Sequence, residues 1–500
     1  MFNHLALVFF AAVTALFGHY ISAALFSSLK IFPGPFWAQF SNFWRFFNVK
    51  KHHKLQLDLH RKYGSAVRFG PNVVSFSDPA LIRTLYDTRG TYPKSDFYSP
   101  MDTLLPSGAI VQNSFGTRDN TWHGQYLKPI SAFYRDMKHV FALEPQIDST
   151  VQHLCDKLSE PCAGKPASVD LERQITYLAY DAVGEITFSS RLGFIDGKGD
   201  DGHIDAAVDA VKHFARTSQV PVVDWWMTKN RYVNLGKGGF GWAADFAIAR
   251  LQQRMKENEE RAKTGETKER LDHLDLFMQL PSTPPEMIVS YTMQNLVAGA
   301  DTVAITIQAT MFHLLKNRSA YDRLTKDLLA ANLSMPVQYK EACSVEYLEA
   351  VINEGLRIAP ANGMSLERVV PSGGLTLPDG RFIPEGTLVG INPWVVQRDE
   401  KIYGAEVDSF KPERWLRASG EDEAAFTQRL QGMKSTMLAF GAGNRVCLGK
   451  KIAELEIYKT IATLVASFEI ALEDPNAKLD QPNYWFTFVE SPIMVRMQKR

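Results

Sequence analysis

The sequence predicts a mainly α-helical protein with small β-sheets and one N-terminal transmembrane helix. Three observations indicate this class. The first 29 residues contain no Lys, Arg, Asp or Glu. From Asp78 to about Leu356, apolar residues recur mostly with helical spacing. Short alternating segments separated by turn residues occur before and after that stretch, which fits a helix-rich body with small sheets at one side.

The N-terminal segment is long enough to be a membrane anchor. At 1.5 Å per residue, a helix over residues 1–30 crosses a hydrocarbon core of roughly 30 Å. A cleaved signal peptide fits less well, because no basic residue precedes the apolar run and the run is too long. Lys30, Arg45 and Lys50 follow it, so we expect the rest of the chain to be cytoplasmic.

Residues 31–50 begin with a Pro-Gly-Pro break and continue with many aromatic side chains. This composition predicts a stiff hinge that leads to a surface resting in the membrane interface. We therefore divide the chain into an anchor over 1–30, a proline and aromatic hinge over 31–50, and one catalytic domain over 51–500.

Charge and cysteine content exclude two classes of protein. Lys plus Arg and Asp plus Glu are equal at 55 each, so nothing suggests nucleic acid as the main ligand. Four cysteines without a C-x-x-C pair indicate a reduced, cytosol-facing chain without a disulfide framework.

The individual elements follow in order. "AVRFG" and "VVSFS" around Pro71-Asn72 predict a hairpin. Thr283 and Glu286 predict a capping box with Pro284 at the first helical position, opening a long apolar helix from Met287 to about Leu315. That helix is apolar on more than one face, so we expect it to cross the core. Short strands, a cysteine loop, a last helix and a C-terminal strand pair follow.

The cysteine loop, Phe440–Gly449, reads "FGAGNRVCLG". It fails the phosphate-loop pattern because Asn444 stands at the first glycine position and Lys451 at the hydroxyl position. A dinucleotide fingerprint would end on Val446 instead of glycine. A phosphatase-type thiolate needs an arginine where Ala453 stands, and zinc would need further Cys or His at short spacing.

A metal held by one protein ligand takes its other ligands from a macrocycle, and haem accepts an axial thiolate. The loop suits this role, since its glycines allow a flat ring to approach and a helix begins just after Cys447. Arg445 is available to neutralise a propionate. On spacing alone, a structural cysteine in a glycine-rich turn is an equal alternative.

Four motifs in order resemble the cytochrome P450 superfamily. "FGAGNRVCLGKKIAELE" is similar to its haem-binding signature, and "AGADT" (Ala298 to Thr302) lies mid-way along the long helix, like its oxygen-activation motif. "EGLR" (Glu354 to Arg357) resembles its E-x-x-R pair, and "FKPERWL" supplies Arg414 as the usual partner. The resemblance covers the chain after the anchor and implies the cytochrome P450 fold. "YPKSDFY" and "LERVVP" are similar to filamentous-fungal members near the pisatin-demethylase group, which often serve secondary-metabolite pathways.

The resemblance implies haem b (iron protoporphyrin IX) as cofactor. The implied axial ligand of the iron is Cys447, and the other implied haem contacts are Phe440, Arg445, Trp122 and Arg368. The implied catalytic pair for proton delivery is Asp301 and Thr302. The implied structural triad is Glu354, Arg357 and Arg414.

Four of these residues also have a purely structural interpretation. The hydroxyl of Thr302 can bond the carbonyl of Ala298, which alone is an ordinary helix irregularity. The pair Glu354 and Arg357 is usually solvated, and Arg368 could be a solvated strand arginine.

The sequence departs from the family pattern at one haem contact. The basic residue expected four positions after Trp122 is Tyr126, and Lys128 or His123 are the candidates to replace it.

The predicted function is that of a membrane-anchored haem-thiolate monooxygenase that inserts one atom of O2 into an apolar organic substrate. We expect the substrate to be small and apolar or aromatic and the reaction to belong to fungal secondary-metabolite biosynthesis. The chain has no flavin or nicotinamide motif, so electrons would come from NADPH through a separate cytochrome P450 reductase, with cytochrome b5 as a further partner. The implied location is the endoplasmic reticulum membrane.

Two alternative functions remain open. One is a reductase-independent isomerase or dehydratase, against which the acid–alcohol pair argues, and the other is a non-catalytic haem-binding sensor. The segments expected to face the substrate are Pro100–Asn120, His213–Leu235, Ala298–Thr302, Ala361–Leu366 and Tyr484–Phe488.

Overall fold

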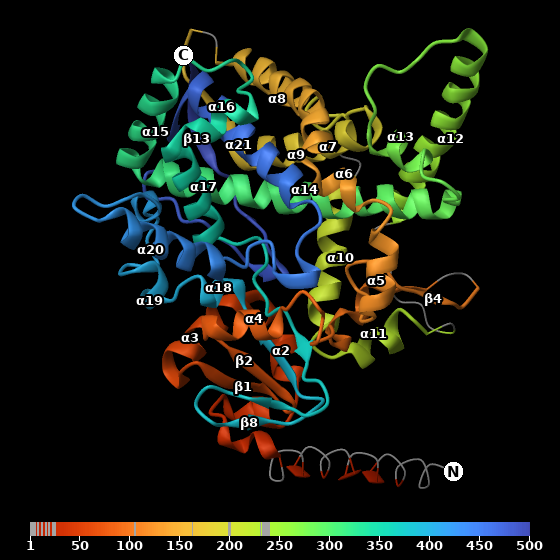
Figure 1. Ribbon diagram of the computed structural model, residues 1–500, viewed down its shortest axis with the longest axis vertical. Coiled ribbons are helices and arrows are strands. Elements are labelled where there is room, and N and C mark those ends of the chain that lie inside the picture. Colours follow the sequence, from red (N-terminus) through yellow and green to blue (C-terminus); the bar gives the residue numbers. More distant parts are fainter. Residues whose placement is uncertain are drawn as a thin grey trace.

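The computed structural model describes residues 7, 10, 11, 14, 15, 18, 21, 22, 27–104, 107–162, 164–198, 202–230, 232 and 241–500. Figure 1 shows a helical region built around one long helix, α14, with a smaller sheet-containing region beside it. Strands β1 and β2 lie at the end of the molecule opposite β13. The prediction of a mainly helical protein with small sheets is confirmed.

The helices have the following bounds: α2 Phe43–Phe47, α3 His52–Tyr63, α4 Ile82–Leu85, α5 Asn120–Leu127, α6 Ser131–Arg135, α7 Met137–Ala142, α8 Glu144–Ser159, α9 Leu171–Phe188, α10 His203–Thr217, α11 Pro221–Met227, α12 Gly241–Thr264, α13 His273–Met278, α14 Pro285–Lys316, α15 Arg318–Ala330, α16 Tyr339–Ser344, α17 Glu346–Ile358, α18 Pro393–Val396, α19 Glu400–Tyr403, α20 Glu423–Thr436 and α21 Lys450–Ser467.

The strands have the following bounds: β1 Ala66–Gly70, β2 Val73–Phe76, β3 Thr103–Leu104, β4 Ile110–Val111, β5 Ala167–Asp170, β6 Arg368–Val369, β7 Leu375–Thr376, β8 Phe382–Ile383, β9 Leu388–Ile391, β10 Phe468–Leu472, β11 Asn483–Tyr484, β12 Phe486–Thr487 and β13 Met494–Lys499. The larger sheets have the orders β1-β2-β9-β6 and β10-β13-β5.

The predicted hairpin and the C-terminal strand pair are both present. Strands β1 and β2 are antiparallel and meet at the predicted turn, and β10 pairs antiparallel with β13. Strand β2 also pairs in parallel with β9, which brings a segment more than 300 residues later beside the hairpin. This sheet places β6, and with it Arg368, at its other edge.

Helix α14 crosses the core as its apolar pattern predicts, and it packs most extensively against α9. The predicted capping box is wrong. The cap residue is Pro284, no side chain caps the helix, and Pro285 is its first residue. A proline disfavours helical geometry in the residue before it, so Pro285 keeps Pro284 extended and delays the helix by one position. Gly299 permits the close approach of α9, because a Cβ there would lie 2.9 Å from Val183.

Residues 27–50 pack against the sheet-containing region and carry two kinds of surface. Leu29 and Phe32 are buried in its core. Arg45 forms an ion pair with Glu367 in which both side chains are only 2% exposed. Phe36, Trp37 and Phe47, in contrast, are 63%, 69% and 78% exposed. This segment is therefore bound to the body while it presents an aromatic surface.

Most of the predicted anchor over residues 1–30 lies outside the described residues. Within the described part of the chain, no helix combines the length and the apolar character needed to cross a bilayer.

Candidate active site

The cysteine loop connects α20 to α21 and is fixed by backbone contacts. The N–H of Cys447 donates to the carbonyl of Phe440 at 2.8 Å, which closes the loop on itself. Gly443 has a φ of 65°, and a Cβ on it would lie 2.2 Å from the carbonyl oxygen of Tyr86. The next N–H, from Asn444, donates to the carbonyl of Asp87 at 3.2 Å. Glycine is therefore required where the loop rests on the chain at Tyr86 and Asp87.

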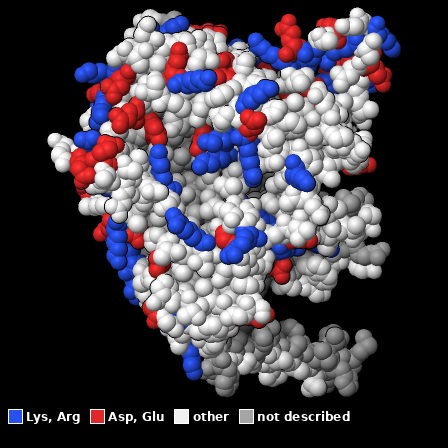
Figure 2. All heavy atoms as spheres, viewed as in Figure 1, with Lys and Arg blue, Asp and Glu red and all other residues white. Residues whose placement is uncertain are grey.

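The Cys447 side chain is accessible, yet it is surrounded by protein. Its accessible surface makes it an exposed cysteine. Burial nevertheless raises the pKa of its thiol, while the backbone N–H groups of Gly449 and Lys450 at the start of α21 act in the opposite direction by bonding the sulfur. The accessible surface of Cys447 and the effect of burial on its pKa are consistent with each other if the sulfur faces a hollow inside the protein. Figure 2 shows a recess near the centre of one face of the molecule, with Lys and Arg side chains around it.

The middle of α14 also has an accessible face. Ala298 is exposed and Thr302, one turn later, is half-buried, although most of the following turns are buried. The hydroxyl of Thr302 donates to the carbonyl of Ala298 at 2.9 Å, as the sequence predicts.

Asp301 faces away from this surface and is buried. Its Oδ1 accepts a hydrogen bond of 2.9 Å from the hydroxyl of Tyr180 on α9. Burial raises the pKa of Asp301 to about 6, against the lowering effect of the Tyr180 bond. The acid and the alcohol are thus neighbours on α14 but point to different sides. No sequence motif pointed to Tyr180.

Three cationic side chains gather near the loop. Arg368 and Lys94 lie opposite each other in an antiparallel bridge, and Arg368 is 3% and Lys94 8% exposed. Burial and the guanidinium groups of Arg368 and Arg445 lower the pKa of Lys94. Burial, followed by the charge of Arg368, lowers the pKa of Arg445 to about 10. Among the described residues, none of the three forms an ion pair, and Nη2 of Arg445 is buried without a hydrogen-bond partner.

The helix α5 contributes aromatic groups instead of the expected cation. Trp122 stacks on Tyr126 with ring centroids 4.7 Å apart. The hydroxyl of Tyr126 is bonded to Ser290 at 2.7 Å, so it is directed at α14. His123 lies close enough to Arg445 and Lys94 that these charges, after burial, help to lower its pKa to about 4. Lys128 is exposed.

Haem fits this set of groups. An accessible thiol sits on a glycine-rich loop, and α14 has an accessible stretch at Ala298 and Thr302. The buried cations lack anionic partners, while haem carries two carboxylates. Because unpaired buried charge is costly, these cations indicate an anionic ligand. The residues that could hold it are Cys447, Arg445, Arg368 and Lys94, with Phe440 and Trp122 as apolar neighbours.

The predicted triad is assembled, and two of its members, Glu354 and Arg357, are fully buried. Nε and Nη2 of Arg357 donate to the two carboxylate oxygens of Glu354, each at 2.8 Å. Nε of Arg414, in the turn Pro412–Trp415, donates to Oε1 of Glu354 at 3.0 Å. The indole N–H of Trp415 and the backbone N–H of Lys411 also donate to this carboxylate, at 2.9 and 2.8 Å. Both Glu354 and Arg357 are 0% exposed.

Gln397 connects this triad to the cysteine loop. Its backbone carbonyl accepts from Nη1 of Arg357 at 3.0 Å. Its side-chain oxygen accepts from the N–H of Leu438, two residues before Phe440, at 2.8 Å. A polar residue in "WVVQRD" carries no recognisable signal, so the sequence did not reveal this link.

Four of the five segments expected to face the substrate, all except Ala298–Thr302, contribute to an aromatic cluster. The rings of Phe115 and Phe214 lie 5.5 and 5.6 Å from that of Trp485. Ala361 and, from α14, Ile305 belong to the same buried cluster. Trp225 and Trp226 are exposed on α11, and residues 231 and 233–235 lie outside the described residues.

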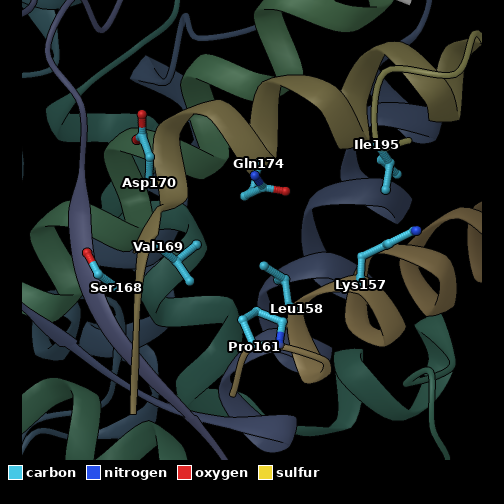
Figure 3. Close-up of a pocket in the computed structure, with 8 residues that line it drawn as sticks. All are labelled: Lys157, Leu158, Pro161, Ser168, Val169, Asp170, Gln174 and Ile195. Atoms are coloured by element: carbon cyan, nitrogen blue, oxygen red, sulfur yellow. The ribbon is translucent and has the colours of Figure 1, made fainter. Parts of the chain in front are cut away.

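A separate pocket of about 330 Å³ lies on the surface between α8, β5 and α9. Figure 3 shows its lining, which includes Lys157 and Leu158 from α8, Val169 from β5 and Gln174 from α9. None of the predicted site residues lines it, and we assign it no role.

Comparison with known proteins identifies the family. The family model described as Cytochrome P450 matches residues 32–497. The chain belongs to the cytochrome P450 family. It has the P450 fold, and membership implies a haem-thiolate cofactor.

The relatives of this P450 are fungal enzymes. It is 36% identical to cytochrome P450 monooxygenase pkfB of Emericella nidulans, over 93% of this chain and 91% of that protein. It is 33% identical to cytochrome P450 monooxygenase cfoH of Aspergillus candidus, over 100% of this chain and 94% of that protein. It is also 33% identical to cytochrome P450 monooxygenase asR2 of Sarocladium schorii, over 94% and 93%. These matches support an oxidoreductase of the P450 monooxygenase type.

Replacing Arg357 by Ala should prevent accumulation of folded holoprotein. The change leaves the Glu354 carboxylate buried with one cation fewer, which typically costs about 3–5 kcal/mol, a large part of the stability of a domain. We expect apoprotein or aggregate, measured by haem content and size-exclusion chromatography. Arg318→Ala is the matched control, since Arg318 is an exposed helix arginine paired with Asp322. A stable, fully haem-loaded Arg357→Ala protein would contradict a structural role for the triad.

Proposed function

We propose that this P450 is a membrane-anchored haem-thiolate monooxygenase that inserts one atom of O2 into an apolar organic substrate in fungal secondary metabolism. One observation carries the proposal. The accessible thiol of Cys447 is two residues from Arg445, whose Nη2 is buried without a hydrogen-bond partner among the described residues, and α14 has an accessible stretch at Ala298 and Thr302 beside the buried Asp301. Haem bound there would supply activation of O2 and oxygen transfer.

Cys447 is the proposed axial ligand of the haem iron. The N–H groups of Gly449 and Lys450 donate toward its sulfur, which supports a thiolate. Phe440 lies at the start of the same loop and Trp122 on α5, and both offer apolar contact to a flat ring. Arg445 and Arg368 are the proposed partners of the haem carboxylates.

Asp301 and Thr302 are the proposed proton-delivery pair. A carboxyl whose pKa is about 6 exchanges protons readily at near-neutral pH. Asp301 reaches the hollow only if it leaves the hydroxyl of Tyr180, so a side-chain rotation is part of the proposed path. Thr302 is half-buried on the accessible stretch of α14, and its proposed role is to hold a water molecule and pass on a proton from Asp301.

The proposed substrate is small and apolar or aromatic, because Phe115, Phe214 and Trp485 form one wall near the site. The proposed electron donor is NADPH through a separate cytochrome P450 reductase, with cytochrome b5 as a second partner. The relatives named as fungal monooxygenases support this assignment.

The proposed location is the endoplasmic reticulum membrane, with one span over residues 1–30 and the catalytic domain in the cytoplasm. Two features support it. The first 29 residues carry no Lys, Arg, Asp or Glu, and the exposed rings of Phe36, Trp37 and Phe47 follow closely in the chain. Aromatic side chains are favoured at the membrane interface.

Deleting residues 1–26 should convert tight membrane attachment into weak attachment and leave haem content unchanged. This deletion keeps Leu29, which is buried in the body and is better retained. The remaining aromatic surface binds less firmly than a spanning helix. Carbonate extraction of membranes, with the full-length chain as control, measures the difference. A truncated protein that resists extraction would contradict a single anchor.

Thr302→Ala should uncouple NADPH consumption from oxidation of the substrate. Haem content should stay unchanged, because Thr302 is not a ligand, whereas proton delivery should fail more often. Positioned proton transfer contributes on the order of 10²–10⁴-fold, of which a replacement water recovers part. Product formed and hydrogen peroxide released per NADPH are measured with reductase. The substrate is first identified by comparing metabolites after deletion of the gene.

Thr306→Ala is the matched control for this experiment. Its hydroxyl donates to the carbonyl of Thr302 at 2.8 Å, so it makes the same kind of bond one turn further along α14, but it is buried. Equal coupling in the parent and Thr302→Ala would reduce Thr302 to an ordinary helix residue and would argue against the monooxygenase assignment.

A further inference from the structure

We propose that Lys94 is a carboxylate-binding residue of the haem site, and that it takes the place of the basic residue that the family pattern expects where Tyr126 stands. The inference deepens the proposed function and rests on it. It assigns a role to Lys94, for which the sequence indicated none.

Lys94 is held in place by contacts that leave part of its ammonium group available. Nζ donates to the carbonyl of Phe115, and it lies 4.0 Å from the ring centroid of Tyr98 and 4.2 Å from that of Phe115. One backbone carbonyl uses only one of the three donors of an ammonium group. The aromatic rings contribute cation–π attraction but accept no full negative charge.

Lys94 and Arg368 form a pair of like charges that a structural role does not explain. They are directly opposite in an antiparallel bridge, so their side chains leave the same face. Like charges in this arrangement are destabilising. The guanidinium of Arg445 adds a third positive charge close enough to affect the pKa of Lys94. An anion between these groups would convert the repulsion into attraction.

The carboxylate that neighbours Arg368 in the chain does not supply this anion. Glu367 precedes Arg368 in the chain, but its carboxylate pairs with Arg45 and also accepts from the hydroxyl of Ser95 at 3.3 Å. Arg45 thereby neutralises Glu367 and leaves Arg368 without an ion pair within the described chain. Lys94, Arg368 and Arg445 therefore remain available to a ligand with two carboxylates, and haem has two.

The other candidates for the missing cation fit less well. Tyr126 is engaged with Ser290 and with Nε2 of Gln294. Lys128 is exposed. His123 lies beside the group, and burial, Arg445 and Lys94 lower its pKa, but it lies on α5 and does not take part in the bridge to Arg368. Lys94 is thus the one candidate among these four that lies directly opposite Arg368 in the strand bridge.

The test compares haem retention and haem–carboxylate contacts in holoprotein variants. Lys94→Met keeps the length of the side chain and removes its charge, and Lys128→Met is the matched control. We expect Lys94→Met to transfer haem to excess apomyoglobin about tenfold faster, a difference of ~1.4 kcal/mol in barrier. Its propionate bending bands in resonance Raman spectra should also shift, whereas Lys128→Met should match the parent in both measurements.

Each outcome decides the proposal. Unchanged haem transfer in Lys94→Met overturns it, and so does faster transfer with unshifted propionate bands, because that pattern means a merely structural lysine. Should Lys94→Met yield no holoprotein, Lys94→Arg decides. A guanidinium donates in a different geometry, so the propionate bands shift if this side chain binds a carboxylate and stay unchanged if it does not. A parent protein without haem would instead overturn the proposed function.

Discussion

The carboxylate of Glu354 is the interaction on which the rest of the site depends. It is fully buried and accepts bonds from two guanidinium groups, one indole and one backbone N–H. Such a group is stable only when every partner is in place, so it fixes α17 against the chain from Tyr403 to Trp415. Arg357 continues the network to Gln397, whose side chain holds the N–H of Leu438 at the entrance of the cysteine loop. The position of Cys447 thus follows from a satisfied buried charge some 90 residues earlier in the chain.

A second group of buried charges consists of cations without anionic partners in the described part of the chain. Lys94, Arg368 and Arg445 repel one another, and Arg45 pairs with Glu367, the carboxylate that neighbours Arg368 in the chain. The first network stabilises the fold without any ligand, whereas the second is completed by an anion. This contrast separates residues that build the site from residues proposed to bind its cofactor. It also connects the segment that follows the proposed anchor to the haem site, because Arg45 lies in that segment.

The sequence predicted those features that repeat a local pattern. The β1–β2 hairpin, helix α14 and the Thr302–Ala298 bond follow from turn residues, apolar spacing and a hydroxyl four positions from a carbonyl. The prediction for the start of α14 was wrong, because the effect of Pro285 on the backbone of Pro284 outweighs the capping potential of Thr283. Lys94, Tyr180 and Gln397 could not be predicted, because their partners are distant in sequence and only the folded chain brings them together. What marks these three residues as functional is their burial and their contact partners, and neither property can be read from a single sequence.

The central claim is that Cys447 is the thiolate ligand of a haem. The most direct measurement is the absorption spectrum of the purified, reduced protein with carbon monoxide, recorded for the parent and for Cys447→Ala. The account predicts the long-wavelength Soret band of a thiolate-bound haem in the parent and loss of that band in the variant. A parent-like band in Cys447→Ala, or a parent spectrum typical of nitrogen-ligated haem, would contradict it.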